Sequence, residues 1–127
     1  MNIREWIQKI RAAGDLLEVE GADPNVELGV VADLLEQKME GPAVLFSRLA
    51  GYPPGYRVLA NTMTSMSRLA LTLGLNSGLP PLSLVAAIKD RLGDVRPLAP
   101  VWVEGGPVLE NVRMGDQVDL FSLPVPT

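Results

Sequence analysis

The chain has 127 residues, of which 47% are apolar and 20% charged, and it carries a formal net charge of −4 with no histidine and no cysteine. A chain of this size and apolar content can bury a core as one domain without disulfides, which argues against intrinsic disorder. The missing side chains exclude Ser-His-Asp and Cys-His catalysis, zinc sites built on histidine or cysteine, and iron–sulfur clusters within these residues. The acidic balance excludes the clustered basic surface that is typical of nucleic-acid binding.

The charge is distributed unevenly. Residues 1–40 hold nine acids and four bases, a net charge of −5, whereas residues 41–127 hold six acids and seven bases, a net charge of +1. The simplest interpretation is a solvated acidic helical face near the N-terminus. Charges within the first six residues would interrupt an apolar leader, so no signal peptide is predicted and the expected compartment is the cytoplasm.

The first half of the sequence predicts helices that alternate with strands. The apolar residues of the first helix recur at the spacing of one helix face, and Gly14 is placed to end it (Ile3, Trp6, Ile7, Ile10). We then expect a strand at 16–20, a helix capped by Asp23-Pro24 and stopped by Gly41-Pro42, a buried strand at 43–46, a turn at 51–55 and a strand at 57–60.

The second half predicts two more helices and then strands. We expect a helix at 65–73 closed by Gly74, a helix at 83–92 closed by Gly93, strands at 101–103 and 108–112 around a glycine turn, and an extended, non-helical segment at 120–127. This order predicts an α+β fold, a single domain with a mixed sheet and several short helices that lie on one side of it.

One uncharged stretch, residues 69–88, is as long as a membrane span. Its cluster of glycine, asparagine and proline residues between 74 and 81 favours helix, loop, helix over one continuous span. We therefore expect no membrane insertion.

The last residues are apolar, stiffened by proline, and carry no charge after Asp119. Most chain ends are polar and frayed, so this segment predicts that more protein follows. The alternative is a genuine but unusual C-terminus.

Few residues form patterns with chemical meaning. The glycine-rich segments at 74–78 and 105–107 lack the spacing of nucleotide-binding loops and are interpreted as turns. Two pairs of carboxylates are too few for a hard-cation site unless the fold adds more (Asp90 with Asp94, Asp116 with Asp119).

Acidic and aromatic residues allow a functional and a structural interpretation. Glu18 and Glu20 would share the solvent face of a strand, and an acid/base site there with Asp15 lacks a recognisable pocket. Trp6 and Trp102 are expected to be core anchors rather than stacking platforms, since no basic groove accompanies them.

Arg68 is the one candidate site residue. It lies in the first turn of the helix at 65–73, where a cation opposes the helix dipole, so it needs a specific partner. A structural ion pair with a carboxylate, or a bond to a neighbouring chain segment, is the favoured interpretation. Contact with a ligand or substrate is the alternative.

Several segments, taken in order over nearly the whole chain, resemble UbiD-family decarboxylases. They are residues 2–20, Asp23-Pro24-Asn25-Val26-Glu27-Leu28-Gly29, Gly41-Pro42-Ala43-Val44-Leu45-Phe46, Asn61 followed by Ser67-Arg68-Leu69-Ala70-Leu71-Thr72-Leu73-Gly74, Pro107-Val108-Leu109-Glu110-Asn111-Val112, and residues 116–127, which end on Leu123-Pro124-Val125-Pro126-Thr127.

The resemblance implies a longer enzyme. Members of the family use prenylated FMN, with a divalent metal and potassium, for reversible non-oxidative decarboxylation of aromatic or α,β-unsaturated acids. Their catalytic and metal-binding residues follow the segment that resembles 120–127, so no catalytic, cofactor-binding or metal-ligating residue is carried over to this chain. The absence of histidine agrees with that arrangement.

The resulting expectation is an accessory domain at residues 1–119 and, at 120–127, an extended proline-rich segment that leads into a flavin-binding domain. The implied partners are the flavin-binding and C-terminal domains of the same enzyme and, at full length, further copies in a homo-oligomer, with no nucleic acid and no membrane. The fragment alone is expected to be inactive and without flavin. Two alternatives are a stand-alone interaction or regulatory subunit and a small carboxylate-binding module that uses Arg57 or Arg68.

Overall fold

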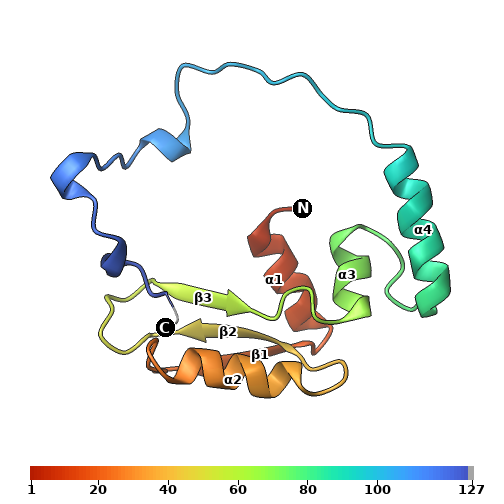
Figure 1. Cartoon of the computed structure of the whole chain (residues 1–127), viewed down its shortest axis with the longest axis horizontal. Helices are drawn as coiled ribbons and strands as arrows, with labels where there is room; N and C mark the ends of the chain where they lie inside the picture. Colours follow the sequence, from red (N-terminus) through yellow and green to blue (C-terminus); the bar gives the residue numbers. More distant parts are fainter. Residues whose placement is uncertain (126–127) are drawn as a thin grey trace.

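A computed structural model describes residues 1–125 and shows one small α+β domain with a long arm (Figure 1). In this part of the chain, β1 (Leu16–Glu20), β2 (Ala43–Ser47) and β3 (Arg57–Ala60) form a sheet in the order β1-β2-β3. β1 and β2 are parallel, and β2 and β3 are antiparallel. The predicted fold class, with its mixed sheet and short helices, is confirmed.

α1 (Ile3–Ala12) packs on one face of this sheet as its apolar spacing predicts. The Asn2 side chain caps it by accepting a hydrogen bond from the Glu5 N–H at 3.0 Å. Trp6, Ile7 and Ile10 are buried, and Gly14 follows in the left-handed conformation, with φ +72°. Because only glycine adopts that conformation without strain, Gly14 ends the helix and turns the chain into β1.

The core is divided by the central strand, β2. Val44 and Phe46 face a cluster that includes Leu28 and Leu35, whereas Ala43 and Leu45 face Trp6, Ile7 and Ile10. Successive side chains of a strand point to opposite faces, so an uninterrupted apolar run needs a cover on both.

Both faces are indeed covered. α2 (Glu27–Glu36) lies on one face, and α1 and α3 (Met66–Thr72) lie on the other (Figure 1). The expectation that the helices lie on one side of the sheet is therefore wrong. The buried run at 43–46, correctly predicted as a strand, already required helices on both sides.

The predicted start of α2 is also wrong, because Asp23 and Pro24 form a turn before the helix. The Asp23 carboxylate accepts from the Asn25 N–H at 2.9 Å, which closes a local turn. The Glu27 carboxylate in turn accepts from the Asp23 N–H at 2.8 Å, and the helix begins at Glu27. An aspartate whose side chain closes a turn delays the helix that its sequence signal predicts.

The uncharged stretch at 69–88 folds as helix, loop, helix, as predicted. α3 is capped by the Ser65 side chain, and Gly74 ends it with φ +67°. α4 (Pro81–Gly93) then begins with Pro81 in its first turn, two residues before the predicted start. No helix in residues 1–125 combines the length and the apolarity that a membrane crossing requires.

Residues 95–125, called the arm below, leave α4 and arch away from the sheet before they return to the loop between β2 and β3 (Figure 1). The strands predicted at 101–103 and 108–112 are absent from the described structure. The only regular structure there is a 3₁₀ turn, η1 (Pro107–Leu109). A strand needs a neighbouring strand to which it can hydrogen-bond, and these residues have none within residues 1–125.

The end of the arm was predicted to be extended from residue 120 onward, and this prediction is wrong for residues 120–122. After the 3₁₀ turn η2 (Gly115–Gln117), η3 (Leu120–Ser122) forms because the Asp119 carboxylate accepts from the Phe121 N–H at 2.9 Å. The prolines come after this turn and do not prevent it. Pro126 and Thr127, the last residues of the predicted extended segment, lie outside the described residues.

Candidate functional site

The Arg68 side chain is the most deeply buried charge of the described chain, with 1% of its surface exposed. Its guanidinium donates to the Asp15 carboxylate at 2.6 Å, to the Gly41 carbonyl at 2.7 Å and to the Thr64 hydroxyl at 2.9 Å. Asp15 precedes β1 and Gly41 precedes β2. Arg68 therefore connects the start of α3 to the chain segments that enter both parallel strands.

Local structure positions this arginine. The Ser65 hydroxyl accepts from the Arg68 backbone N–H at 3.2 Å, which sets the first turn of α3 and aims the side chain back toward the sheet. A buried cation that loses its carboxylate leaves an uncompensated charge in the core, at a cost of about 3–5 kcal/mol. The network therefore fixes where α3 sits on the sheet.

Gly41 is the residue of this network whose role the sequence signal understated. A Cβ atom there would collide with the backbone carbonyl of Leu35 at the end of α2. Glycine lets the chain pass close to the helix and present its carbonyl to Arg68. The sequence marks Gly41 as a helix stop, and only the packing shows that it is also a partner of the buried cation.

Arg68 has one donor left over. Its buried Nε atom has no hydrogen-bond partner among the described residues. A hollow of about 210 Å³ lies beside the ion pair and includes Asp15, Ser67 and Ser77 in its lining. Such an N–H group can donate a hydrogen bond to a water oxygen or to an oxygen of a ligand.

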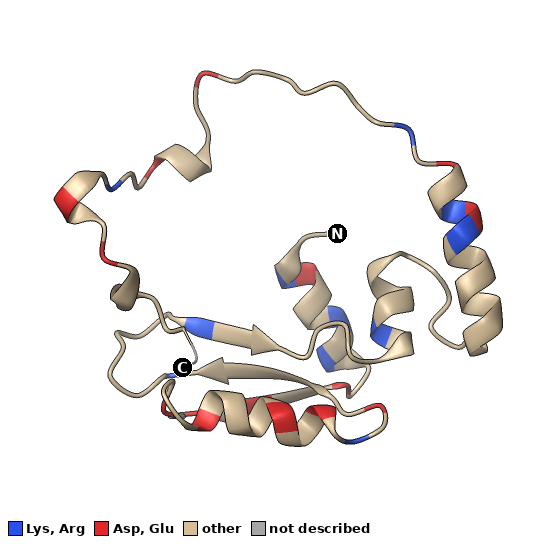
Figure 2. Ribbon diagram, viewed as in Figure 1, with Lys and Arg blue, Asp and Glu red and all other residues tan. Residues whose placement is uncertain are grey.

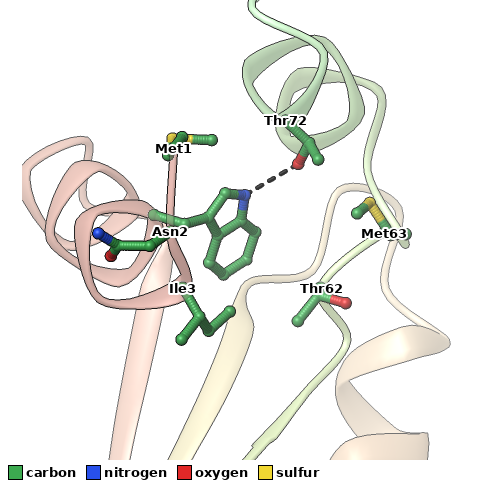
Figure 3. Close-up of a pocket in the computed structure, with 7 residues that line it drawn as sticks. Met1, Asn2, Ile3, Thr62, Met63 and Thr72 are labelled. Carbon is green, nitrogen blue, oxygen red and sulfur yellow. Dashed lines mark hydrogen bonds between the residues drawn. The ribbon is translucent and has the colours of Figure 1, made fainter. Parts of the chain in front are cut away.

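A second hollow, of about 220 Å³, lies beside Trp6 where α1 faces α3 and the segment after β3 (Figure 3). The Trp6 indole N–H donates to the Thr72 hydroxyl at 2.9 Å, and Met1, Ile3 and Met63 add apolar surface. Trp6 is 4% exposed, so it is a core anchor as predicted, whereas Trp102 is 96% exposed and its prediction as a core anchor is wrong.

The acidic residues singled out in the sequence are spread over separate contacts. Glu18 pairs with Arg11 at 2.7 Å and Glu20 pairs with Arg48 at 3.0 Å, both on the surface. The Arg11 hydrogen bond lowers the pKa of Glu18, and Glu18 in return raises the pKa of Arg11. Within residues 1–125, no three of His, Cys, Asp and Glu come close enough to share a metal ion.

The two arginines of the carboxylate-binding alternative have different surroundings. Arg57 is exposed at the start of β3, where it lines a hollow of about 170 Å³ together with Arg4 and Arg11. Arg68 is buried, and Asp15 already neutralises its charge. Of the two, Arg57 is the one whose side chain is exposed to a solvent anion.

The arm exposes many large apolar side chains. Residues 95–121 are all exposed, and Trp102, Phe121 and Leu98 each expose more than 90% of their surface. Six of the 31 residues of the arm are charged, which is about the same proportion as in the whole chain (Figure 2). Apolar side chains exposed over a segment of this length are unusual on an isolated protein.

The end of the arm is held against the domain. The Tyr52 hydroxyl, in the loop between β2 and β3, lies 3.2 Å from the carbonyl oxygens of Phe121 and Leu123 and can donate to either. The sequence predicted a turn around Tyr52 but gave no sign of this contact. Its partners, Phe121 and Leu123, lie 69 and 71 positions after Tyr52 in the chain.

Comparison with known proteins assigns the family. The model of the 3-octaprenyl-4-hydroxybenzoate carboxy-lyase N-terminal domain, the UbiD N-terminal domain, matches residues 7–92. The chain belongs to this family. The matched residues include α1 from Ile7 onward, the sheet, and the Arg68 network.

Relatives of this UbiD-family chain are much longer proteins. The pyrrole-2-carboxylic acid decarboxylase of Pseudomonas aeruginosa is 36% identical over 134 residues, which cover 99% of this chain and 27% of the relative. The vanillic acid decarboxylase of Sedimentibacter hydroxybenzoicus in its open form matches with a TM-score of 0.77 and 27% identity, over 94% of this chain and 25% of that one. This chain therefore spans about a quarter of the length of these relatives.

A third relative shows the cofactor of its class. An evolved dimeric form of the UbiD-class enzyme HmfF from Pelotomaculum thermopropionicum, in complex with prFMN, matches with a TM-score of 0.65 and 26% identity, over 98% of this chain and 27% of that one.

The hollows beside Trp6 and Arg68 do not fit prFMN. The first has no charged residue in its lining, and in the second Asp15 already pairs the cation. No step of flavin or metal chemistry is assigned to these residues.

Proposed function

We propose that this chain is the N-terminal accessory domain of a longer UbiD-family enzyme. That enzyme would catalyse the reversible non-oxidative decarboxylation of aromatic or α,β-unsaturated carboxylic acids with prenylated FMN, in the cytoplasm. Membership of the family, and a length of about a quarter of its relatives, support the proposal. The pyrrole-2-carboxylic acid, vanillic acid and prFMN named for those relatives support the proposed substrate and cofactor classes.

The accessory role rests on the arm. A domain that only had to fold would bury apolar side chains such as Trp102 and Phe121, which are 96% and 93% exposed. Their exposure supports a domain that packs beside the flavin-binding domain and braces it. Residues 1–119 would form the domain, and 120–127 would lead into the next one. In this proposal Arg68 is a structural residue that positions α3.

We further propose that the 127-residue chain alone binds no flavin and has no decarboxylase activity, because the family's cofactor-binding residues lie beyond the part that this chain matches. The purified chain should show no flavin absorbance after incubation with prenylated FMN, and it should release no carbon dioxide from pyrrole-2-carboxylate or vanillate. Flavin that stays bound through gel filtration would overturn this proposal.

The gene itself tests the longer enzyme. Sequencing past the codon for Thr127 should reveal a reading frame that continues into a flavin-binding domain. A stop codon at that point, with no such domain encoded nearby, would contradict the single-enzyme version.

The same arm supports a second candidate, a stand-alone subunit that binds a separate enzyme chain. The two differ in covalent connection: the subunit would be made as a 127-residue protein and would co-purify with a partner. Mass spectrometry of the protein isolated from its natural source separates them. A mass near 13.7 kDa favours the subunit, and a mass about four times larger favours the accessory domain.

A further inference from the structure

Two segments of the arm, 101–103 and 108–112, have the sequence of strands but pair with no strand among residues 1–125, and the second contains only the 3₁₀ turn η1. Val101, Trp102 and Val103 are 83%, 96% and 72% exposed, and Val108 is 85% exposed. Valine and tryptophan favour strands because they pack well on a pleated surface. Between residues 96 and 105 the described chain makes no backbone–backbone hydrogen bond at all. These backbone groups are satisfied by water only while the arm stays exposed.

The apolar pattern also specifies what kind of strand this is. In an extended chain Val101 and Val103 point to one face and Trp102 to the other, so both faces are apolar. The same pattern occurs in β2, where Ala43, Val44, Leu45 and Phe46 run consecutively and are each at most 3% exposed. β2 lies inside the sheet and is covered on both sides. The pattern at 101–103 therefore matches an inner strand rather than an edge strand.

Both ends of the arm are fixed while its middle is bare. The arm begins at the end of α4, and its other end contacts Tyr52 through the Phe121 and Leu123 carbonyls. The strand-like residues lie between these points, where the chain stands away from the sheet (Figure 1). A partner that covers them must sit on the arm itself.

We propose that residues 101–112 become a two-stranded β-ribbon, with Glu104-Gly105-Gly106-Pro107 as its turn, when they are built into a sheet of the polypeptide that follows this domain in the longer enzyme. Insertion would cover both faces of Val101–Val103 and supply the missing backbone partners. This inference rests on the proposed function, and it adds the mode of docking: folding of the ribbon and docking of the domain are one event.

The occupant follows from length and position. The matched relatives contain about three quarters of their chain beyond the part that this chain covers. The described chain returns to the β2–β3 loop at Leu123. Residues that follow in a longer protein would therefore leave the domain beside this loop, next to the C-terminal end of the arm. A connected domain is therefore presented to the arm at high local concentration. A second copy of this chain is the competing occupant.

Hydrogen exchange on a fusion tests the proposal. The 127-residue chain is joined to the part of the Pseudomonas aeruginosa decarboxylase that lies beyond its match, and exchange is compared with that of the chain alone. We expect the amides of 101–103 and 111–112 to exchange at unprotected rates in the chain alone, and those of Leu109 and Glu110 to be protected at most by the single 3₁₀ turn η1. In the fusion they should slow by about 100-fold or more, as buried strand amides do.

A matched pair of variants assigns the protection to the ribbon. Trp102 and Met39 are both 96% exposed, and only Trp102 lies on the arm. Trp102→Ala should lower the unfolding temperature of the fusion and reduce the protection of 101–112. Met39→Ala should do neither, and both variants should leave the chain alone unchanged.

The remaining outcomes separate this inference from the proposed function. A fusion that decarboxylates its substrate while 101–112 stay unprotected would overturn the ribbon and leave the proposed function intact. Protection of 101–112 in the chain alone, together with a dimer by light scattering, would assign the arm to a second copy instead. A fusion that does not fold, repeated with the Sedimentibacter hydroxybenzoicus relative, would count against both.

Discussion

The body of the domain and its arm use the same kind of sequence with opposite results. Ala43–Phe46 in β2 and Val101–Val103 in the arm are both consecutive apolar runs, yet the first is buried and the second is exposed. β2 has a strand on each side and helices on both faces, whereas the arm has neither. An apolar run becomes a strand only where the rest of the chain supplies its edges and its covers.

The comparison predicts that substitutions in the body lower stability and that equivalent ones in the arm do not. The largest effect is expected at Arg68. Arg68→Ala leaves Asp15 without its cation and the Gly41 carbonyl without its donor, so the free energy of unfolding should fall by about 3–5 kcal/mol in urea titrations. The control is Arg48→Ala, whose pair with Glu20 is largely exposed and should contribute at most about 1 kcal/mol. Equal losses in the two variants would refute a structural role for the buried pair.

Gly41→Ala should come next. The new methyl group meets the Leu35 carbonyl, which belongs to the backbone and cannot turn aside, so stability should fall by about 1–3 kcal/mol. Gly29→Ala is the matched control, because a Cβ atom at that position in α2 has nothing within 4 Å. This control should stabilise the chain by up to about 1 kcal/mol, since alanine is the better helix former. Thermal unfolding of both variants measures the difference.

A smaller effect is expected at the two tryptophans. Trp6→Phe removes the hydrogen bond to Thr72 and should lower the free energy of unfolding by about 1–2 kcal/mol, whereas Trp102→Phe should leave it unchanged. Fluorescence separates the two residues: Trp6 should emit at shorter wavelength than Trp102 because it is buried. A destabilised Trp102→Phe chain would show that the arm packs on the body.

The smallest effect concerns surface electrostatics. Arg11 lowers the pKa of Glu18 through a hydrogen bond, so Arg11→Gln should move the pKa of Glu18 up toward its ordinary value, as NMR titration would show. A carboxylate whose pKa is depressed by folding stabilises the fold above its unfolded pKa, and that contribution disappears as the pH falls through the folded pKa. Acid unfolding of Arg11→Gln should therefore depend slightly less on pH. Arg48→Gln, which alters the neighbouring Glu20 pair instead, should leave the pKa of Glu18 where it is.

Local patterns predicted the body of the domain well. The strands at 16–20 and 57–60 have the predicted bounds, and Ser65 and Gly74 delimit α3 as predicted. These features depend on alternation, caps and glycine conformation, which a short stretch of sequence contains. The start of α2 was not predictable in the same way, because Asp23 can cap a helix or close a turn, and here it closes a turn.

Local sequence patterns could not predict features that depend on residues far apart in the chain. The position of Arg68 indicated that it needs a partner, but Asp15 is 53 residues away, and only the fold brings the two together. Asn61, noted only as part of a family motif, adopts φ +58° and donates to the Ala32 carbonyl at 2.7 Å, which ties the end of β3 to α2. Its tolerance of the left-handed region was the one available signal. The arm shows the opposite case: its pattern predicts strands, and residues 1–125 offer them no strand partner.

The contact between Tyr52 and the end of the arm has a thermodynamic consequence. A segment attached only at α4 would be a tail, and a partner would have to restrict all of its freedom at once. Attachment at Tyr52 makes it a loop whose two ends are both held on the domain. Part of the entropy loss that the proposed docking requires has thus occurred when the domain folds. The Tyr52 hydroxyl, which lies outside the arm, therefore lowers the entropic cost of docking the arm.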